Sequence, residues 1–562
     1  MRYRSTRHSG ALLVHLILAL PLAFFVAFLY LGCSVGGISP AHDDPVTFTA
    51  FFADPNPTWN DGNDDIGRYI AETRGVTLDV ETAAGDPEVT IRLLAISGDY
   101  PDFISPKGTT GELIAAGALL DLTDLIGEHA PNIEAMLGDE INRLRYSESD
   151  PSIYFIPTLD KVDQYYYTVG GPFNLQLDAV RELGYPDIRT LGDYEAAIRG
   201  YIERHPTING QETIGLSLLA EDWRILISTT NPAFYATGAP DDGEYYIDPE
   251  TYEATLHYKR PAEREYFRWL NHMNDAGLLD PESFVQSYDQ YLTKIASGRV
   301  LAVIDQDWAI SPAVNKLKAD GLFERTYGRF PVTLDETYEI PVFQQTGYIG
   351  SWGTGITTSC EDPVRAIRFL DWLASEEGQI LVNWGIEGVH YEYDEHDRRA
   401  FLPEIAALRT RDENEFRRRT GIGNYNISLR YGDGNKDSTG NYFTLQNPEQ
   451  LLEKYSDLEK EVLAAYGATY WKDLFPGEDE FPVKAWGAAW TISYPNDSPL
   501  TTFYQRQQEI IRRRIPEAIL VSPEEFDRVY DAMLMELDAA GAPEMEALFT
   551  EYVRERVELW NR

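Results

Sequence analysis

The fold is decided near the start of the chain by VTFTAFF at residues 46–52, a run of β-branched and aromatic residues that predicts a strand. Residues 66–73 follow with apolar side chains at helical spacing, and Gly75 is expected to end that helix. Residues 77–81 predict a second strand. Strand, helix and strand in this order predict two parallel strands joined by a helix.

A second helix and a third strand follow directly. Asp86 and Pro87 predict a helix start, because the carboxylate caps free backbone N–H groups and proline suits the first helical position. Residues 103–105 then predict a short strand. The side chains expected to face the sheet from this helix are Val89, Leu93, Leu94 and Ile96. The order of elements predicts a parallel, doubly wound sheet.

The remaining chain alternates between helices and short strands and then becomes mostly helical. Further helices are expected at residues 175–183, 193–204, 262–275, 283–297 and 363–374. Short strands are expected at residues 214–217, 300–304 and 353–357. The predicted fold class is therefore α/β with a helix-rich C-terminal part. About 530 residues follow the N-terminal segment, too many for a single core, which predicts two or three lobes.

The N-terminal segment has the layout of an export signal. Three arginines within the first seven residues precede an apolar run at residues 11–31, which a small residue separates from Cys33. The run resembles the lipobox of bacterial lipoproteins, in which the cysteine is acylated after the signal is cut. We expect residues 1–32 to be a signal peptide and residues 33–45 a lipidated, flexible tether on the outer face of the cell membrane. An uncleaved transmembrane anchor stays open, because the run approaches the length that spans a bilayer.

The charge of the chain excludes some partners. It has 91 acidic and 48 basic residues, which gives a net charge of −43. Such a field repels nucleic-acid phosphates and anionic lipid head groups, so no nucleic-acid partner is expected. The expected link to the lipid bilayer is the acylated Cys33. Cys360, the other cysteine, then has no partner in the chain, and no disulfide framework is expected.

Six short motifs occur in an order that makes the chain recognisable. They are FFADPNPTWN at 51–60, SGDYPD at 97–102, AGALLDLT at 116–123, GLLDPE at 277–282, the stretch 352–363, and WGAAW at 486–490. With the lipobox they resemble the extracellular solute-binding lipoproteins of ABC importers, in particular the LipO- and LplA-like proteins of Gram-positive bacteria. The resemblance covers essentially the whole mature chain.

The resemblance implies a two-lobed, periplasmic-binding-protein-like fold of type II, with two doubly wound sheets that close on a ligand. It implies an N-terminal lobe of residues 46–160 plus 300–350, and a C-terminal lobe of residues 161–299 plus 351–562. It also implies capture of an oligosaccharide and delivery to membrane permease subunits. The importer's ATPase would be a separate protein, since this chain lacks a GxxxxGK[ST] loop.

No cofactor and no metal are expected. Many relatives that bind long or acidic oligosaccharides carry a calcium loop after the helix near residue 200. Here the corresponding stretch is HPTINGQE at 205–212, which offers too few oxygen ligands for a hard cation. Two other loops alternate Asp and Asn, at residues 61–65 and 433–437, and both are interpreted as ordinary polar loops.

Ligand-binding candidates follow from the predicted topology and from the resemblance. In doubly wound folds the ligand lies at the carboxyl ends of strands, where the loop after residues 46–52 and the turn after residues 103–105 are expected. Plentiful Trp and Tyr rings suit the apolar faces of sugars, although about half of the tryptophans are expected in the core instead. Asp99 is placed near the cleft by the resemblance alone. The candidates are Asn56, Trp59, Asp99, Lys107, Tyr166, Trp223, Trp308, Trp352 and Trp486.

The charge of the ligand is left open by the sequence. The acidic composition favours a neutral or weakly charged glycan. Lys107, Lys161 and Arg224 could nevertheless build a local basic pocket for an acidic sugar.

Two other functions remain as alternatives. The same fold could serve as a surface carbohydrate sensor that feeds a signalling receptor. A secreted polysaccharide hydrolase is a weaker alternative, because 91 acidic residues make a catalytic carboxylate pair trivial to propose. The GxSxG and HExxH motifs are absent from the sequence. No catalytic residue is assigned, and the chain is expected not to be an enzyme.

Overall fold

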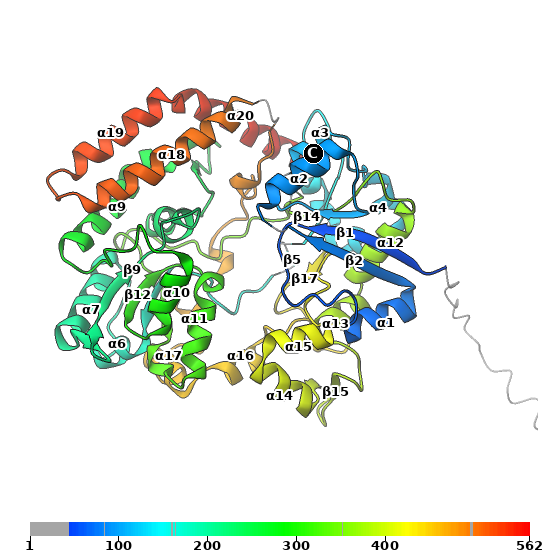
Figure 1. Cartoon of the computed structure of the whole chain (residues 1–562), viewed down its shortest axis with the longest axis horizontal. Helices are drawn as coiled ribbons and strands as arrows, with labels where there is room; N and C mark the ends of the chain where they lie inside the picture. The colour runs from blue at the N-terminus through cyan, green and yellow to red at the C-terminus, as the bar shows by residue number, and fades with distance from the viewer. Residues whose placement is uncertain are drawn as a thin grey trace, which may run out of the picture. The chain divides into compact units, whose positions relative to one another are not determined.

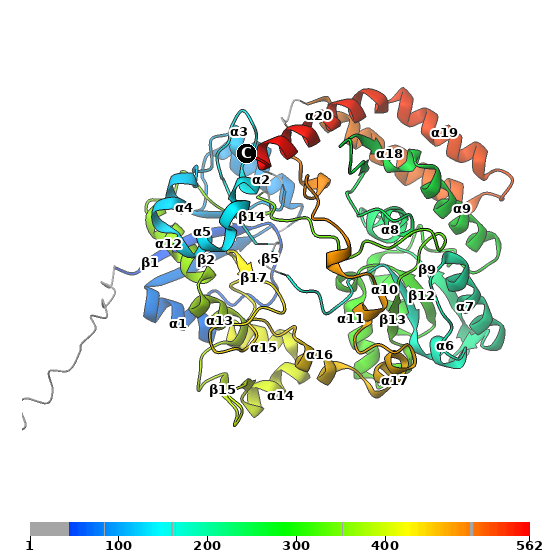
Figure 2. The same ribbon diagram turned by 180° about the vertical axis from the view of Figure 1, so that it is seen from behind.

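The computed structural model describes residues 44–83, 85–108, 110–158, 161–162, 164–350, 352–494 and 498–562 (Figures 1 and 2). Side chains are described at these positions except at Lys161 and Val162. The predicted signal peptide, most of the predicted tether and Cys33 lie outside the described residues. Among the described helices, each is too short or too polar to cross a bilayer.

The first lobe is built on a five-stranded sheet. Its strands, in spatial order, are β2 (Val76–Thr82), β1 (Val46–Phe52), β3 (Phe103–Ser105), β14 (Gly353–Ile356) and β4 (Ile156–Pro157). β1 is parallel to β2 and β3, and β14 runs antiparallel to β3.

Both faces of the first sheet are covered. Side chains alternate along β1, so successive residues pack into apolar clusters on opposite faces. Phe48 packs into one apolar cluster, and Phe51 packs into another. The helices that contribute to these clusters or flank them are α1 (Asp65–Arg74), α2 (Pro87–Ser97), α4 (Thr123–His129), α5 (Pro131–Leu137) and α12 (Pro363–Ala374). This confirms the predicted α/β architecture around residues 46–105.

The second lobe is built on a four-stranded sheet. Its strands are β13 (Tyr327–Phe330), β6 (Phe173–Gln176), β12 (Val300–Ile304) and β9 (Ile214–Ser217), in that order. β12 is parallel to β9 and antiparallel to β6, and every residue of β12 is buried. The bounds predicted for β9 and β12 agree with the structure.

The C-terminal part consists of helices, as predicted. α18 (Pro499–Leu520) packs between α19 (Phe526–Ala539) and α9 (Pro261–Asp275), and α20 (Ala542–Trp560) follows α19 (Figure 1). Side chains from these helices belong to the same apolar cluster as the second sheet. The C-terminal helices therefore extend the second lobe.

The predicted division of the chain into lobes is wrong at two places. Residues 300–350 were assigned to the first lobe, but β12 and β13 lie in the second sheet. Residues 351–445 were assigned to the second lobe, but β14 pairs with β3, and side chains from 356 to 429 pack into the first core. The chain passes between the cores three times, and such crossings depend on contacts between distant residues that leave no local signal in the sequence.

The predicted inward face of α2 is right for Leu94 but wrong for Val89, Leu93 and Ile96. Ile91 is fully buried, whereas Leu93 is 61% and Ile96 is 83% exposed. Ile91 and Leu94 belong to the cluster around Phe51, which sets the face of the helix that meets the sheet. The stripe of apolar residues at helical spacing lies on the solvent side instead.

Candidate ligand-binding site

The carboxyl edge of the first sheet brings three sequence-distant segments together. β1 and β3 are parallel with Phe52 opposite Ser105, so the residues that follow both strands leave the sheet at the same edge. β14 is antiparallel to β3 and begins at this edge, directly after Trp352. Ligands of open α/β sheets bind at such carboxyl edges.

Lys107 lies at the centre of this edge. Its Nζ is 2.5 Å from Asp54 Oδ1 and 5.8 Å from the centre of the Trp352 ring. A Cβ added to Gly108 would lie 2.9 Å from Trp352 Nε1, so the backbone and the ring are in close contact. The structure therefore brings together two predicted residues, Lys107 and Trp352, and adds a carboxylate partner, Asp54.

Trp352 also contacts the second lobe. Its ring meets that of Trp490 edge to face, with the ring centres 5.0 Å apart and the planes at 80°. Trp490 remains 45% exposed. It lies in a short helical turn, η7 (Ala489–Thr491), whose Ala489 packs into the core of the second lobe. The Trp352–Trp490 pair thus bridges the two lobes with an accessible aromatic surface.

A buried polar cluster holds the segment that carries Trp490. The Asp242 carboxylate accepts hydrogen bonds from Lys484 Nζ at 2.6 Å, Trp486 Nε1 at 3.0 Å and the backbone N–H of Ala489 at 3.1 Å. Trp486 is 4% exposed. Trp486, predicted to contact ligand, therefore lies inside the core of the second lobe and positions its neighbour.

The carboxyl edge of the second sheet carries a second pair of tryptophans. β9 and β12 are parallel, and Trp223 and Trp308 lie in the segments that follow them. The two rings stack with their centres 6.0 Å apart and their planes at 14°, and they are 46% and 55% exposed. Both tryptophans were predicted as ligand-binding residues, and the structure brings them together at this edge.

An arginine and an aspartate lie beside the Trp223–Trp308 pair. The Arg224 guanidinium lies 5.0 Å from the ring centre of Trp223 and 4.3 Å from that of Tyr288. It forms an ion pair with Asp222, whose carboxylate also accepts from the backbone N–H of Arg224. The second lobe thus repeats the chemistry of the first, with a tryptophan, a cation and a neighbouring carboxylate at the carboxyl edge of its sheet.

Asp305 directly follows β12, three residues before Trp308. Its carboxylate accepts from the Tyr291 hydroxyl at 3.0 Å and from the backbone N–H of Gln306 at 2.8 Å. Burial raises the pKa of Asp305 to about 7, and the nearby positive charge of Arg224 offsets part of that rise. A carboxyl group at this edge therefore titrates near neutral pH.

The segment with three consecutive tyrosines passes between the cores. Alternate side chains of the extended segment lie on the same side, and the rings of Tyr165 and Tyr167 meet at 4.8 Å. Tyr166, the predicted ligand-binding residue, instead stacks on Phe343 of the second core at 5.4 Å. Tyr165 is 46% exposed and lies against Lys472, whose Nζ is 3.6 Å from the ring centre.

A polar crevice of about 390 Å³ lies between residues of both lobes. The first lobe supplies the Asn56 loop and the start of α15 (Glu413–Thr420), and the second supplies Asn315 from α11 (Asp307–Ala319). Small-molecule sites commonly occupy about 300–1,000 Å³. Asn56 lines this crevice, and its amide donates to Asn424 Oδ1 at 3.2 Å.

Two predicted residues lie away from the tryptophan pairs. Trp59 packs on the first core, where its ring centre is 5.1 Å from that of Tyr425. Asp99 is exposed between α2 and β3, at the amino edge of the sheet. Because β3 separates Asp99 from Lys107, the two residues lie at opposite edges of the sheet.

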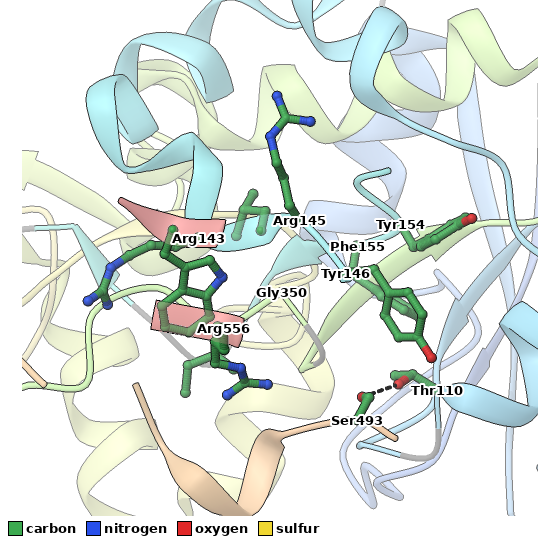
Figure 3. Close-up of a pocket in the computed structure, with 12 residues that line it drawn as sticks. Thr110, Arg143, Arg145, Tyr146, Tyr154, Phe155, Gly350, Ser493 and Arg556 are labelled. Atoms are coloured by element: carbon green, nitrogen blue, oxygen red, sulfur yellow. Dashed lines mark hydrogen bonds between the residues drawn. The ribbon is translucent and has the colours of Figure 1, made fainter. Parts of the chain in front are cut away.

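Figure 3 shows a second, much smaller cavity of about 30 Å³. Arg556 from α20 lines it and donates hydrogen bonds to Thr491 Oγ1 at 2.9 Å and to the Thr491 carbonyl at 2.7 Å. Burial and the nearby charge of Arg143 lower the pKa of Arg556 to about 9. At this volume the cavity is a weaker candidate for an oligosaccharide site than the crevice of about 390 Å³.

The loops considered for metal binding use their carboxylates internally. Asp64 caps α1 and accepts from the Tyr425 hydroxyl, and Asp437 forms a buried ion pair with Arg399. The stretch at 205–212 forms a hairpin of β7 (Thr207–Ile208) and β8 (Gln211–Glu212). Among the described residues, no group of three or more His, Cys, Asp or Glu side chains is placed to hold a metal ion.

Some residues at the sheet edges were missed as candidates. Asp54 and Asp222 lie only a few residues after the ends of β1 and β9. Because ligands bind at the carboxyl ends of strands, both aspartates could have been predicted from the sequence. Trp490 and Tyr165 could not be chosen over their neighbours Trp486 and Tyr166. Which of two nearby aromatic rings faces the core depends on packing that the sequence pattern does not show.

A family profile described as bacterial extracellular solute-binding protein matches residues 66–384. A curated relative, the fructooligosaccharide ABC transporter substrate-binding protein FusA of Streptococcus pneumoniae, is 21% identical over 242 residues. That alignment covers 41% of this chain and 44% of the relative, so the match spans less than half of FusA.

Solved structures resemble the whole two-lobed unit. A FusA EF-hand mutant in complex with fructo-nystose aligns with a TM-score of 0.64 and 17% identity, over 91% of this chain and 99% of that one. An HMO-binding, ABC-transporter-associated solute-binding protein from Bifidobacterium longum infantis aligns with a TM-score of 0.66 and 12% identity, over the same shares. At these identities the likeness concerns the fold. The sheets, the order of elements and the profile match together show that this chain belongs to the bacterial extracellular solute-binding protein family.

Proposed function

We propose that this protein captures an oligosaccharide between its two lobes and delivers it to the permease subunits of an ABC importer. The observation that carries the proposal is the pair of accessible tryptophans at each sheet edge, Trp352 with Trp490 and Trp223 with Trp308. Flat aromatic rings cover the apolar faces of sugars, and neighbouring charged groups fix the hydroxyl groups. The names of FusA and of the HMO-binding protein are consistent with this ligand class.

The expected event is binding without a chemical reaction. The family consists of solute-binding proteins, and capture requires only that both lobes contact the ligand in the closed state. Incubation of the purified protein with an oligosaccharide should return the sugar intact by mass spectrometry. Release of shorter products by the protein would favour a hydrolase instead.

The binding proposal is tested by titration calorimetry with neutral tri- to pentasaccharides, including kestose. We expect Trp308→Ala and Trp490→Ala each to weaken binding by about tenfold or more, because a stacking surface is removed. Trp372→Phe is the matched control. Trp372 lies on α12 and donates to Glu377, away from both sheet edges. Equal affinity of the wild type and both alanine variants would contradict the assignment of the site.

Transport is tested in the native host by deleting the gene for this protein and measuring uptake of the sugar that binds. We expect uptake to fall to background and to return when the wild-type protein is restored. Restoration with Trp308→Ala should support uptake only at higher sugar concentration, because the capture step is weakened. Undiminished uptake in the deletion strain would leave binding intact and contradict the role in import.

We also propose that Cys33 anchors the mature protein to the outer face of the cell membrane. The support is the lipobox-like sequence at the end of the apolar run at residues 11–31. Cys33→Ser should release the protein into the medium or leave a larger, uncleaved precursor on a gel. Unchanged retention and size would instead favour a transmembrane anchor.

A further inference from the structure

We propose that the ligand is an uncharged oligosaccharide and that Asp54 and Asp222 are the specificity-determining residues that reject acidic sugars. The inference rests on the proposed function and names the substrate class of the same site. Its basis is that the carboxyl edge of each sheet presents a cation beside a tryptophan, which is half-buried in the first lobe (Trp352) and exposed in the second (Trp223), and pairs that cation with a carboxylate from the same edge.

In the first lobe the neutralised cation is Lys107. Asp54 follows the end of β1, Lys107 follows the end of β3, and their side chains form an ion pair. Lys107 is 43% and Asp54 65% exposed, so both remain accessible beside Trp352. A ligand that reaches the Trp352–Trp490 pair therefore meets a donor and an acceptor together.

In the second lobe the neutralised cation is Arg224. Asp222 holds it through a side-chain ion pair and also accepts from its backbone N–H at 2.8 Å. Arg224 in turn contacts the ring of Trp223. Because the carboxylate lies only two residues from the arginine and caps its backbone, the pairing is built into the local turn.

Lys472 is a third cation that is paired with a carboxylate, and it lies beside the tyrosine segment that passes between the cores. Lys472, which lies against the exposed Tyr165, pairs with both carboxylate oxygens of Glu478 at 3.2 Å. Arg556 is bonded to backbone carbonyls and a hydroxyl, and it lines the cavity of about 30 Å³. Each of these cations already has acceptors within the protein.

Electrostatics then disfavour an acidic sugar at either edge. A uronate or sulfate that approached Lys107 or Arg224 would also approach the carboxylate paired with it, and the repulsion would oppose the attraction. The excess of acidic residues across the chain adds to the repulsion of an anion. A sugar hydroxyl both donates and accepts, so it can bond to both members of an ion pair at once.

The first experiment compares neutral tri- to pentasaccharides with oligouronides of the same length by titration calorimetry. We expect the neutral sugars to bind with affinities that change by less than about twofold between 20 and 500 mM NaCl, because no net charge is neutralised on binding. Oligouronides should bind about 100-fold more weakly or not at all.

The second experiment frees the cations with Asp54→Asn and Asp222→Asn. We expect each variant to bind oligouronides at least about tenfold more tightly than the wild type does, with the gain largest at low salt. Asp99→Asn, at the opposite edge of the first sheet, removes the same charge and is the matched control. It should leave oligouronide binding unchanged.

The outcomes separate the two proposals. Tight binding of oligouronides by the wild type, weakened by salt, would overturn this inference and leave oligosaccharide capture intact. The same gain in Asp99→Asn as in Asp54→Asn would also overturn it, since the effect would then come from overall charge. Binding of neither sugar class would overturn the proposed function and this inference with it.

Discussion

Asp305 shows how a single buried carboxyl group at a sheet edge makes stability depend on pH. Burial raises its pKa to about 7, so the folded protein holds a proton that the unfolded chain releases near pH 4. The group's contribution to the free energy of unfolding is therefore greatest at low pH. It declines as the pH rises from about 4 to about 7, by on the order of 4 kcal/mol in total.

Asp305→Asn should remove this part of the pH dependence. Urea midpoints measured from pH 5 to pH 8 should fall less in the variant than in the wild type, because the amide does not ionise. Asp289→Asn, on the exposed surface of α10 (Tyr288–Ala296), is the control and should follow the wild type. Parallel curves for Asp305→Asn and the wild type would show that the carboxyl group does not titrate in this range.

At the residue scale, the sequence predicted positions that follow parallel strands better than it predicted which aromatic rings are exposed. Lys107 and Trp308 were predicted because each follows the carboxyl end of a correctly predicted strand. Trp486 was a wrong choice within WGAAW, since its ring is buried against Asp242 while Trp490 is exposed. That difference is set by the Asp242 carboxylate, more than 240 residues away in sequence.

Among the helices, α5 depends on an N-terminal cap supplied by another helix. Asp371 of α12 accepts from the backbone N–H groups of Asn132 and Ile133, at 2.7 and 2.9 Å, and from the Asn132 side chain at 2.7 Å. The carboxylate satisfies donors that the first turn of α5 leaves free and interacts favourably with the helix dipole.

Asp371→Ala should lower the free energy of unfolding by about 2–3 kcal/mol, because buried N–H groups lose a charged acceptor. Asp124→Ala, at an exposed position in the first turn of α4, should cost about 0.5 kcal/mol or less and serves as the control. Chemical denaturation of the three proteins measures the difference. Equal losses in both variants would mean that the cap contributes no more than a surface charge.

Elements with strong local signals were predicted well, and those defined by distant pairing were not. The bounds of β9, β12 and α12 agree with the sequence patterns. Residues 175–183 were predicted as one helix, but Phe173–Gln176 forms β6, and α6 begins only at Leu177. β6 exists because it pairs with β12 and β13, which lie more than 120 residues further along the chain.

At the scale of the whole molecule, Arg143 of the first lobe contacts the segments that lead to the second lobe. Its guanidinium donates to the Thr346 carbonyl at 2.7 Å and to the Lys484 carbonyl at 2.9 Å. It also lies 4.9 Å from the ring centre of Trp560 in α20. Motion of one lobe against the other must therefore preserve these contacts or break them.

Arg143→Ala should lower the free energy of unfolding by about 2–3 kcal/mol and broaden the range of lobe separations without ligand, because two partly buried carbonyl groups lose their charged donor. Small-angle scattering and denaturation measure the two effects. Arg145→Ala is the matched control, since Arg145 bonds only to Asn142 and Pro151 of the first lobe among the contacts described. Identical scattering profiles for Arg143→Ala and the wild type would rule out a role in lobe separation.

The interleaving of the two cores has a consequence for how the protein is made. The first core needs β1 at residue 46 and side chains as far as residue 429, and the second needs side chains as far as residue 557. A ribosome must therefore finish most of the polypeptide before either half can complete its interior. Until then, neither lobe has all the side chains of its core.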